Sequence, residues 1–391
     1  MVQEKRQTQK RVLIFSLAYF PHASGAEIAI KEITDRISRG DIAFDLVTLR
    51  FDKTAALVEK LGNVRVYRVV GLPFDGYLNK ALFPLLAAIG AYRLHKKNHY
   101  DVLWAMMSYM VLPIVLLRML GVRVPYVLTL QDGDPFEHVF NRPHILPFKP
   151  LLKSGFKHAA VVQVISNYLG RWAQKVGYSG PVEVIPNGVN IQKFAGEKIA
   201  HDGITLITTS RLVQKNAVDD VIRALVRLPE RVTFKILGDG PEKAALEKLA
   251  ENLGVTNRVQ FLGNIDNIEI PKYVRAADIF VRPSRTEGLG ISFLEAMAAG
   301  LPVIATREGG IADFLFDAKH NPEKPTTGFA VDKDSPEQIA ERVKEILDAS
   351  NEEVVAHVVA NAQKLVQEKY DWDKIAKAMQ ERVFAQALKT R

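Results

Sequence analysis

Cysteine is absent from this 391-residue sequence, and so are apolar runs long enough to cross a bilayer. Without thiols, the chain has no disulfide bonds, no thiolate metal ligands and no cysteine nucleophile. One apolar segment, Val102–Leu117, has 16 residues between Asp101 and Arg118 and is interrupted by Pro113. A spanning helix needs about 20 residues. We therefore interpret this segment as a buried strand followed by a buried helix.

Runs of basic residues interleaved with aromatic residues are also absent, although the net charge is +8. Because nucleic-acid-binding chains usually carry such runs, we do not expect a nucleic acid partner. The positive charge still favours anionic partners, such as phosphorylated substrates or an acidic membrane face. Composition, with 48% hydrophobic and 25% charged residues, indicates an ordinary soluble globular protein. A chain of this length predicts two domains.

Short β-branched runs alternate with helical patterns along most of the chain. This alternation predicts parallel sheets covered by helices on both faces. The N-terminal stretch resembles a secretory signal, but a helical pattern follows it at once, so we interpret it as the first strand. The strands expected in the first half are Arg11–Leu17, Phe44–Arg50, Val64–Val70, Val102–Met106, Pro125–Leu130, Val161–Ile165 and Val182–Ile185. The helices expected between them are Ala26–Ser38, Ala81–Lys97 and Asn167–Val176.

The same alternation restarts after residue 203. The strands expected there are Ile204–Thr209, Thr233–Leu237, Val259–Leu262, Ile279–Arg282 and Val303–Thr306. We predict an α/β fold of two doubly wound domains in series, facing each other across a cleft. Ligands of such sheets bind beyond the carboxyl ends of the strands.

Domain limits follow from composition. The expected parts are a first domain over residues 1–188, a linker over 189–203, a second domain over 204–370 and a C-terminal helix over 371–391. The linker is expected because its Pro, Asn, Gly and Lys residues show no periodicity. The helices expected near the C-terminus are Pro336–Ala349, Glu352–Gln367 and Trp372–Leu388, and the last is expected to return to the first domain.

Two glutamates stand out in the stretch RPSRTEGLGISFLEAMAAG, residues 282–300. Glu287 precedes a glycine-bearing turn, and Glu295 lies in an apolar helix predicted to begin near Ile291. A buried charge is costly unless it is paired. The N-terminus of that helix favours an anion through its backbone N–H groups and its dipole. The residues that supply these groups are Gly288, Leu289, Gly290 and Ile291.

The two carboxylates suit hydroxyl groups rather than phosphate. We therefore expect a ligand with phosphate in its middle, a sugar on one side and a ribose on the other. Two alternatives remain open at this point. Glu287 could be a helix-start carboxylate, and Glu295 could form a buried ion pair with an arginine.

Cations that could neutralise such a phosphate follow the strand Ile204–Thr209. Arg211 and Lys215 in TSRLVQKNAVDD are expected at the carboxyl edge of the second sheet. Arginine offers bidentate hydrogen bonds to phosphate and lysine a mobile point charge. Taken alone, the pair is better explained as surface charges. Glycine turns at Gly238 and Gly25 would let the backbone approach a ligand closely.

Together, the motifs SRLVQKN, GDGPEK, FLGNI, RPSRTEGLGISFLEAMAAGLPVIAT, GG and TGFAV resemble a known family. This is the large group of retaining, nucleotide-sugar-dependent glycosyltransferases with the Glu-seven-residues-Glu motif, family 4 or group 1. SGAE and VIPNGVN resemble its first-domain loop and interdomain crossover. The resemblance is specific over residues 204–331 and weaker over residues 1–180. It implies the GT-B fold, with two Rossmann-like domains and the donor held mainly by the second.

The resemblance also implies roles for single residues. Glu287 would bind the hydroxyl groups of the donor sugar, and Glu295 those of the ribose. Arg211 and Lys215 would neutralise the diphosphate, so we predict Glu287, Arg211 and Lys215 as the catalytic residues. The backbone at residues 288–291 would contact the sugar and the distal phosphate. The remaining donor-binding residues implied are Gly25, Gly238, Phe261 and Leu262, with a less certain contact at Glu308 to Gly310.

Two departures from the family pattern matter. Ala217 stands where many members have glycine, which allows a tighter turn or a shifted Lys215. Gln131 stands where many members have a histidine, and glutamine cannot act as a base. Asp132 or Asp134 could take over, or the leaving phosphate could accept the proton of the acceptor. The candidates on the acceptor side are thus Gln131, Asp132, Asp134 and His138.

Asp132–Asp134 also resembles the metal-binding triplet of the other large glycosyltransferase fold, but here the donor signature lies elsewhere in the chain. We therefore expect no metal and no cofactor beyond the donor itself. The predicted activity is retaining transfer of a hexose from a UDP- or GDP-linked donor to a glycan or lipid-linked acceptor in cell-envelope synthesis. The alternatives are a non-catalytic protein that binds nucleotide sugars and a nucleotide-sugar epimerase of similar fold.

The segment Leu78–Tyr100 combines apolar residues with Lys80, Arg93, Lys96 and Lys97. This pattern is typical of an interfacial helix, and each basic residue near an anionic surface contributes about 1 kcal/mol. The alternative is a helix packed on the first sheet with a solvated basic end. The first interpretation predicts a cytoplasmic protein that docks on the inner face of a membrane.

Overall fold

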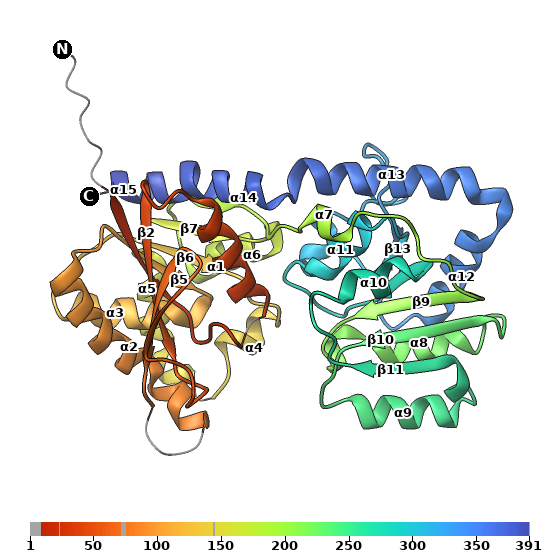
Figure 1. The fold of residues 1–391 in the computed structure, drawn as a ribbon, viewed down its shortest axis with the longest axis horizontal. Coiled ribbons are helices and arrows are strands. Elements are labelled where there is room, and N and C mark those ends of the chain that lie inside the picture. Colours follow the sequence, from red (N-terminus) through yellow and green to blue (C-terminus); the bar gives the residue numbers. More distant parts are fainter. Residues whose placement is uncertain (1–8, 23, 72–75, 144, 391) are drawn as a thin grey trace, which may run out of the picture. The chain divides into compact units, whose positions relative to one another are not determined.

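The computed structural model of the chain describes residues 9–22, 24–71, 76–143 and 145–390. The chain forms two compact units, residues 1–187 with 372–391 and residues 188–371. Each unit has a largely parallel sheet with helices, so the predicted α/β class is confirmed (Figure 1). No helix in the described ranges combines the length and apolar character needed to cross a bilayer.

The sheet of the first unit has the strand order β3-β4-β2-β1-β5-β6-β7-β8 over the described residues. Its strands are β1 (Lys10–Phe15), β2 (Ile42–Leu49), β3 (Val58–Leu61), β4 (Val64–Val69), β5 (Val102–Met106), β6 (Tyr126–Leu130), β7 (Val161–Val164) and β8 (Val182–Val184). Among the described strands of this sheet, only the edge strand β3 is antiparallel. The order reverses at β1 and β5, which makes their carboxyl ends the switch point of this sheet.

Helices of the first unit come from both ends of the chain. They are α1 (Gly25–Arg36), α2 (Gly76–Asn98), α3 (Val111–Met119), α4 (Phe136–Phe140), α5 (Lys149–Lys157), α6 (Asn167–Val176), α14 (Trp372–Ala378), a π-helical turn (Met379–Phe384) and α15 (Ala385–Lys389). The C-terminal segment packs into the core of this unit. The Phe384 ring lies 5.1 Å from Trp104 and 5.9 Å from Phe44, measured between centroids.

The sheet of the second unit has the order β11-β10-β9-β12-β13-β14 within the described part of the chain. Its strands are β9 (Ile204–Thr209), β10 (Val232–Leu237), β11 (Val259–Gly263), β12 (Ile279–Arg282), β13 (Val303–Ala305) and β14 (Phe329–Ala330). Its helices are α7 (Ile191–Phe194), α8 (Val218–Leu225), α9 (Lys243–Asn252), α10 (Ile270–Arg275), α11 (Ile291–Ala298), α12 (Pro336–Leu347) and α13 (Glu352–Lys369). The order reverses at β9 and β12, so their carboxyl ends form the switch point.

Some elements were not expected from the sequence. Strand β3 is short and lies at the edge of the sheet, with Val58 exposed, so it lacks the continuous apolar run of the other strands. The segment 189–203, expected as a linker, belongs to the second unit and contains α7. Asn190 caps this helix by accepting a hydrogen bond from the N–H of Lys193, which is why an aperiodic stretch still forms a helical turn.

Candidate functional site

The carboxyl ends of β9 and β12 organise the candidate site of the second unit. The loop 210–217 follows β9, and the loop 283–290 follows β12 and leads into α11. The two strands are neighbours, with Leu206 opposite Ile279. Both loops therefore begin at the same edge of the sheet, where ligands of doubly wound sheets bind.

Glycines bring a third loop against the first. Gly238 follows β10 with φ +138°, and a Cβ there would lie 1.9 Å from the carbonyl oxygen of Ser210. At Gly240, a Cβ would lie 2.2 Å from the carbonyl oxygen of Leu212. The N–H of Leu212 donates to the carbonyl of Asp239 at 2.9 Å. Glycine is thus required because backbone packs directly on backbone.

The turn that carries Lys215 ends at Ala217. This residue has φ +52°, in the left-handed region that favours glycine. The sequence had left open a tighter turn or a shifted Lys215. The structure keeps the left-handed turn and places a strained alanine in it. Nearby, the side-chain amide of Asn216 donates to the carbonyl of Arg211 at 2.7 Å, which closes the loop on itself.

Arg285 joins the two loops. Its N–H donates to the carbonyl of Lys215 at 2.7 Å, and its Nη1 donates to the carbonyl of Gln214 at 2.6 Å. The guanidinium also donates to both carboxylate oxygens of Asp219 at 3.0 Å and to Asp220 at 3.2 Å. These partners raise the pKa of Arg285, the Asp219 hydrogen bond most strongly. Burial raises the pKa of Asp220 to about 6.

Arg282 at the end of β12 forms a buried ion pair with Glu287. Its Nη2 donates to Oε2 of Glu287 at 2.7 Å, and the two side chains are only 7% and 16% exposed. Its Nη1 donates to the Ser292 hydroxyl at 2.7 Å, and the guanidinium lies 4.1 Å from the centre of the Phe293 ring. Burial lowers the pKa of Arg282, against the opposing effect of Glu287 and Glu295. The ion pair considered for Glu295 is therefore formed by Glu287.

Backbone contacts fix Glu287 further. Its Oε1 accepts from the N–H of Gly288 at 2.9 Å, and its carbonyl accepts from the N–H of Gly310 at 2.9 Å. Gly309 has φ +64°, and a Cβ there would lie 2.0 Å from the same carbonyl. Residues 309–310 thus support the loop that carries Glu287.

Glu295 has the opposite surroundings. No hydrogen bond or ion pair joins its carboxylate to any residue that the structure describes. Its helix neighbours Leu294, Ala296 and Met297 are buried. Burial raises the pKa of Glu295 to about 7, although the charges of Lys193 and Arg282 act against the shift. This half-buried carboxylate is therefore available to accept hydrogen bonds from a ligand.

The backbone before α11 offers unpaired donors. The helix begins at Ile291, as predicted, with Gly290 at φ +85° as its N-cap. The N–H groups of residues 289–291 have no acceptor among the described residues. A Cβ at Gly290 would lie 2.5 Å from the Phe293 ring and 2.7 Å from Nη2 of Arg282, so glycine is needed here. These donors and the helix dipole favour an anion.

Several buried polar atoms at this edge also lack a partner in the described structure, and they are not among the predicted site residues. Three hydroxyl groups lie at the end of β9 and one follows β12. These atoms are Oγ1 of Thr208, Oγ1 of Thr209, Oγ of Ser210, Oγ of Ser284, Oδ1 of Asn216 and Nε of Arg282. Buried polar groups are normally hydrogen-bonded, so this concentration indicates a polar ligand. A strand-end Thr-Thr-Ser run beside a glycine turn is the signal that could have identified them.

The other residues expected on the donor side lie on the same unit. Arg211 is exposed on the loop after β9, and its side chain forms no ion pair within the described ranges. Phe261 and Leu262 lie in β11, both half-buried. Glu308 pairs with Lys333 at 3.4 Å and is 39% exposed. Gly25, the first residue of α1, belongs to the first unit.

Candidates on the acceptor side lie at the carboxyl edge of the first sheet. Gln131 follows β6 and exchanges two hydrogen bonds of 3.0 Å with the side-chain amide of Asn187. Asp132 is buried and accepts from the Ser108 hydroxyl at 2.7 Å, and burial raises its pKa. Met107, just after β5, has φ 75° and ψ 157°, a region almost reserved for glycine. Such strain concentrates at functional sites.

Asp134 and His138 lie farther along the same loop. Asp134 accepts from Nη2 of Arg142 at 3.4 Å, and Nε2 of His138 lies 3.9 Å from its carboxylate. Both side chains are substantially exposed, so they differ from the buried Asp132. Over the described residues, no group of three or more His, Asp or Glu side chains has an arrangement that could hold a metal ion.

Two family models match the chain. Residues 190–365 match "Glycosyl transferases group 1", and residues 23–193 match "Glycosyltransferase Family 4". The chain is 34% identical, over 237 residues, to a GDP-mannose-dependent alpha-(1-6)-phosphatidylinositol monomannoside mannosyltransferase of Mycobacterium tuberculosis. That match covers 55% of this chain and 59% of the relative. An alpha-monoglucosyldiacylglycerol synthase of Streptococcus pneumoniae is 25% identical over 75% of this chain and 70% of its own length.

Solved structures share the fold. Sucrose-phosphate synthase from Thermosynechococcus elongatus superposes with a TM-score of 0.82 at 20% identity, covering 98% of this chain and all of its own. Anabaena HepE in complex with UDP-glucose gives a TM-score of 0.77 at 21% identity, covering 96% and 99% of the two chains. These similarities show the architecture of the chain.

Proposed function

Because the chain belongs to the group 1 glycosyl transferases, with a family 4 N-terminal part, we propose that it transfers a hexose from a nucleoside-diphosphate sugar. The observation that carries this proposal is the set of unpartnered polar groups around β9 and β12. They comprise hydroxyl groups, backbone N–H groups and the carboxylate of Glu295. A ligand with a diphosphate, a ribose and a sugar has the groups that would pair with them.

In the proposed complex, the diphosphate lies between the N-terminus of α11 and the loop after β9. The N–H groups of residues 289–291 and the side chains of Arg211 and Lys215 would then neutralise it. Glu295 would accept hydrogen bonds from the ribose hydroxyl groups. Glu287 keeps its ion pair with Arg282, which orients its carboxylate toward the hydroxyl groups of the sugar.

The proposed reaction breaks the bond between C1 of the sugar and the distal phosphate oxygen. A bond between C1 and the acceptor oxygen forms on the same face, as the family resemblance implies. The proton of the acceptor hydroxyl passes to the departing phosphate oxygen. Negative charge develops on that phosphate in the transition state, so the nearby cations and N–H groups stabilise it.

For the acceptor, we propose a lipid-linked molecule at a membrane surface. By their names, one relative described above transfers mannose to a phosphatidylinositol monomannoside and the other synthesises a monoglucosyldiacylglycerol. On α2, Leu78, Leu85 and Ile89 lie on one face and are 45%, 51% and 41% exposed. Arg93 and Lys96 continue that face. An exposed apolar stripe flanked by cations suits an interfacial helix.

Donor binding tests the first part of the proposal. Calorimetry with UDP and with GDP identifies the base. Incubation with the matching sugar nucleotides and a lipid acceptor then measures transfer, and NMR of the product reports whether the anomeric configuration is retained. Release of nucleotide without any transfer product would favour a hydrolase, and conversion of the donor without acceptor an epimerase. No binding of either nucleotide would contradict the proposal.

Metal dependence tests the role of the cations. If Arg211 and Lys215 neutralise the diphosphate, transfer continues in excess chelator. Complete loss of turnover in chelator, restored by magnesium or manganese, would return Asp132 and Asp134 to consideration as metal ligands.

Vesicle flotation tests the membrane part. Wild-type protein is expected to float with anionic vesicles at low salt, and Leu85→Asp/Ile89→Asp is expected to remain in the soluble fraction. A matched control is Ile268→Asp/Val354→Asp, which changes two exposed apolar residues of the second unit. Equal behaviour of the two variants would contradict docking through α2, and a soluble acceptor would become the better proposal.

A further inference from the structure

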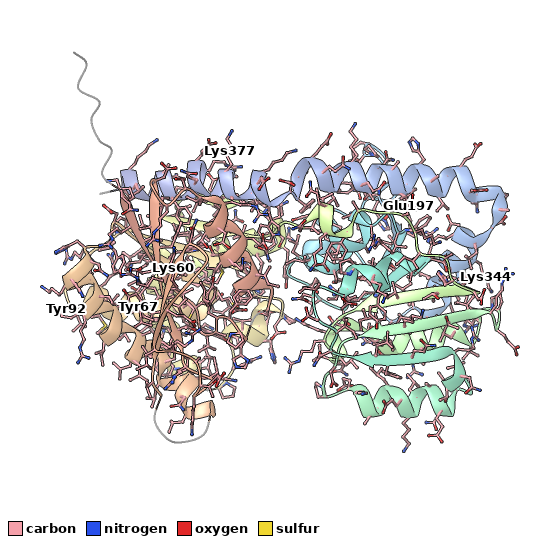
Figure 2. The ribbon with its side chains drawn as sticks, in the orientation of Figure 1. Lys60, Tyr67, Tyr92, Glu197, Lys344 and Lys377 are labelled. Atoms are coloured by element: carbon pink, nitrogen blue, oxygen red, sulfur yellow. The ribbon has the colours of Figure 1, made fainter. Side chains whose placement is uncertain are left out.

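A cavity of the first unit lies at the opposite edge of its sheet from the candidate acceptor residues. It has a volume of about 410 Å³ and lies between the C-terminal ends of α2 and α3 and the starts of β5 and β6. Its lining residues are Tyr92, His95, Lys96, His99, Tyr100 and residues 120–125. Figure 2 labels Tyr92, one of these lining residues, at the left of the view. None of the roles proposed so far uses this cavity.

The cavity lining has cations but no carboxylates among its described residues. Lys96 and Arg123 are both exposed, and neither forms an ion pair with a described residue. Nδ1 of His95 accepts a hydrogen bond from the N–H of Tyr100 at 3.2 Å, which holds the imidazole ring in the wall of the cavity. A cavity with these donors favours an anion with several acceptor oxygens, such as a phosphate.

Helix ends explain only part of this charge. Cations in the last turn of a helix are favourable through its dipole, which accounts for Lys96 on α2. Arg123 lies beyond the end of α3, outside either helix, yet it lines the same cavity. The cavity therefore gathers cations from two separate elements.

The rim of the cavity is apolar and exposed. Met119 and Leu120, at the end of α3, are 72% and 58% exposed, and Leu120 also lines the cavity. Gly121 follows with φ +86°, which turns the chain sharply after them. Helix α3 packs against α2, whose exposed stripe ends in Arg93 and Lys96. The apolar rim and the cavity thus continue the proposed docking surface.

We propose that this cavity binds the phosphate headgroup of an anionic membrane lipid, while Met119 and Leu120 enter the acyl region beside it. The proposal rests on the membrane docking of α2 described above and adds a specific lipid site to it. The adjacent apolar residues select a lipid over a free phosphate, because a soluble anion would give exposed Met119 and Leu120 no partner.

Flotation of matched variants tests the site. Lys96→Gln/Arg123→Gln removes two charges from the cavity, and Lys248→Gln/Lys344→Gln removes two exposed charges from the second unit. The vesicles contain phosphatidylcholine with or without phosphatidylglycerol. We expect affinity for anionic vesicles to fall roughly thirtyfold in the cavity variant, since each basic residue near the surface contributes about 1 kcal/mol. The control variant should keep wild-type affinity.

Equal loss in the two variants would overturn the proposal, because it would mean that only net charge matters. A third variant, Met119→Ser/Leu120→Ser, should bind more weakly at both low and high salt, since it removes apolar contacts. Unchanged binding of this variant would also overturn the proposal.

Inorganic phosphate distinguishes the two sources of the anion. The imidazole NMR signals of His95 and His99 are followed as phosphate or a soluble short-chain phosphatidylglycerol is added. We expect the lipid to shift these signals at far lower concentration than phosphate. Equal potency would make the cavity a free-phosphate site and overturn the lipid assignment.

Calorimetry with the nucleoside diphosphate accompanies these measurements and should give one affinity for all the variants. It separates failure of the lipid site from failure of the proposed activity. If the cavity variant behaves as the control while Leu85→Asp/Ile89→Asp loses binding, only the headgroup site fails.

Discussion

The loop before α11 and the helix itself carry one glutamate each, and the two side chains differ in their partners. Glu287 is paired with the buried Arg282 and with the N–H of Gly288. Glu295 lies eight positions later without a partner among the described residues, and burial raises its pKa to about 7. The same edge therefore has a half whose charges are satisfied internally and a half whose polar groups have no partner among the described residues.

The same division runs through the rest of this edge. Arg285 satisfies Asp219 and Asp220 and fixes the loop of Lys215, whereas the hydroxyl groups at the end of β9 have no partners among the described residues. The paired half holds the loops in place before any ligand arrives, and such preorganisation lowers the cost of binding. We expect changes in the paired half to affect stability and changes in the unpaired half to affect ligand affinity.

The largest effect should come from Glu287→Gln. Removing one partner of a buried ion pair leaves Arg282 without compensation and costs about 3–5 kcal/mol. Chemical denaturation measures the loss in the free energy of unfolding. The control is Glu308→Gln, an exposed pair with Lys333, which should cost less than about 1 kcal/mol. Equal effects of the two substitutions would remove the distinction between a buried and an exposed pair.

The stability of the protein should depend on pH because of the unpaired Glu295. The pKa of Glu295 is raised from 4.5 to about 7, so its contribution to stability is fully present below pH 4.5 and is lost as pH rises through about 7. The shift in pKa corresponds to a loss of about 3 kcal/mol in the free energy of unfolding over this pH range. Without nucleotide, Glu295→Gln should therefore be more stable than wild type above pH 7, and the difference should vanish near pH 4. A constant difference across the series would show that Glu295 does not titrate in this range.

Donor affinity should change in the opposite sense. If Glu295 binds the ribose, Glu295→Gln loses a charge-assisted hydrogen bond worth roughly 1.5–3 kcal/mol, about a ten- to hundredfold loss of affinity. Calorimetry with the nucleoside diphosphate alone measures it. Unchanged affinity together with a collapse of the melting temperature would instead identify Glu295 as a structural residue.

The smallest effect is expected at Ala217, in the turn that carries Lys215. Its φ of +52° costs an alanine more than a glycine. Ala217→Gly should raise the free energy of unfolding by up to about 1 kcal/mol, after the entropy of the added glycine is subtracted. Ala217→Val is the converse variant and should destabilise the turn, because a β-branched residue tolerates positive φ poorly.

The sequence was most informative where structure is decided locally. The limits of β5, β9 and β12 and the start of α11 match the predictions, because β-branched runs and glycine turns specify strands and helix starts over a few residues. The position of the site at the carboxyl edge of the second sheet was predicted from the alternation of strands and helices along the chain. Ala217 was identified only as a departure from the family pattern, and the structure supplies the left-handed turn that explains it.

Pairings between distant residues were not predictable in this way. Arg282 pairs with Glu287 and not with Glu295, and this pairing depends on side-chain geometry inside the fold. Arg285 contacts Asp219, 66 positions away, and Gln131 pairs with Asn187, 56 positions away. No short-range pattern encodes such contacts. The buried hydroxyl groups at the end of β9 were missed because Thr and Ser are common in strands, so a Thr-Thr-Ser run at a strand end becomes informative only once burial without a partner is seen.

The C-terminal segment has a consequence for synthesis on the ribosome. Trp372 and Phe384 belong to the core of the first unit, which otherwise begins with β1. All of residues 188–371 are translated before that segment, so the second unit can close while the first still lacks part of its interior. The nascent first half thus exposes apolar surface around Phe44 and Trp104 until residue 384 has been synthesised, and chaperones that recognise such surface can bind it until then.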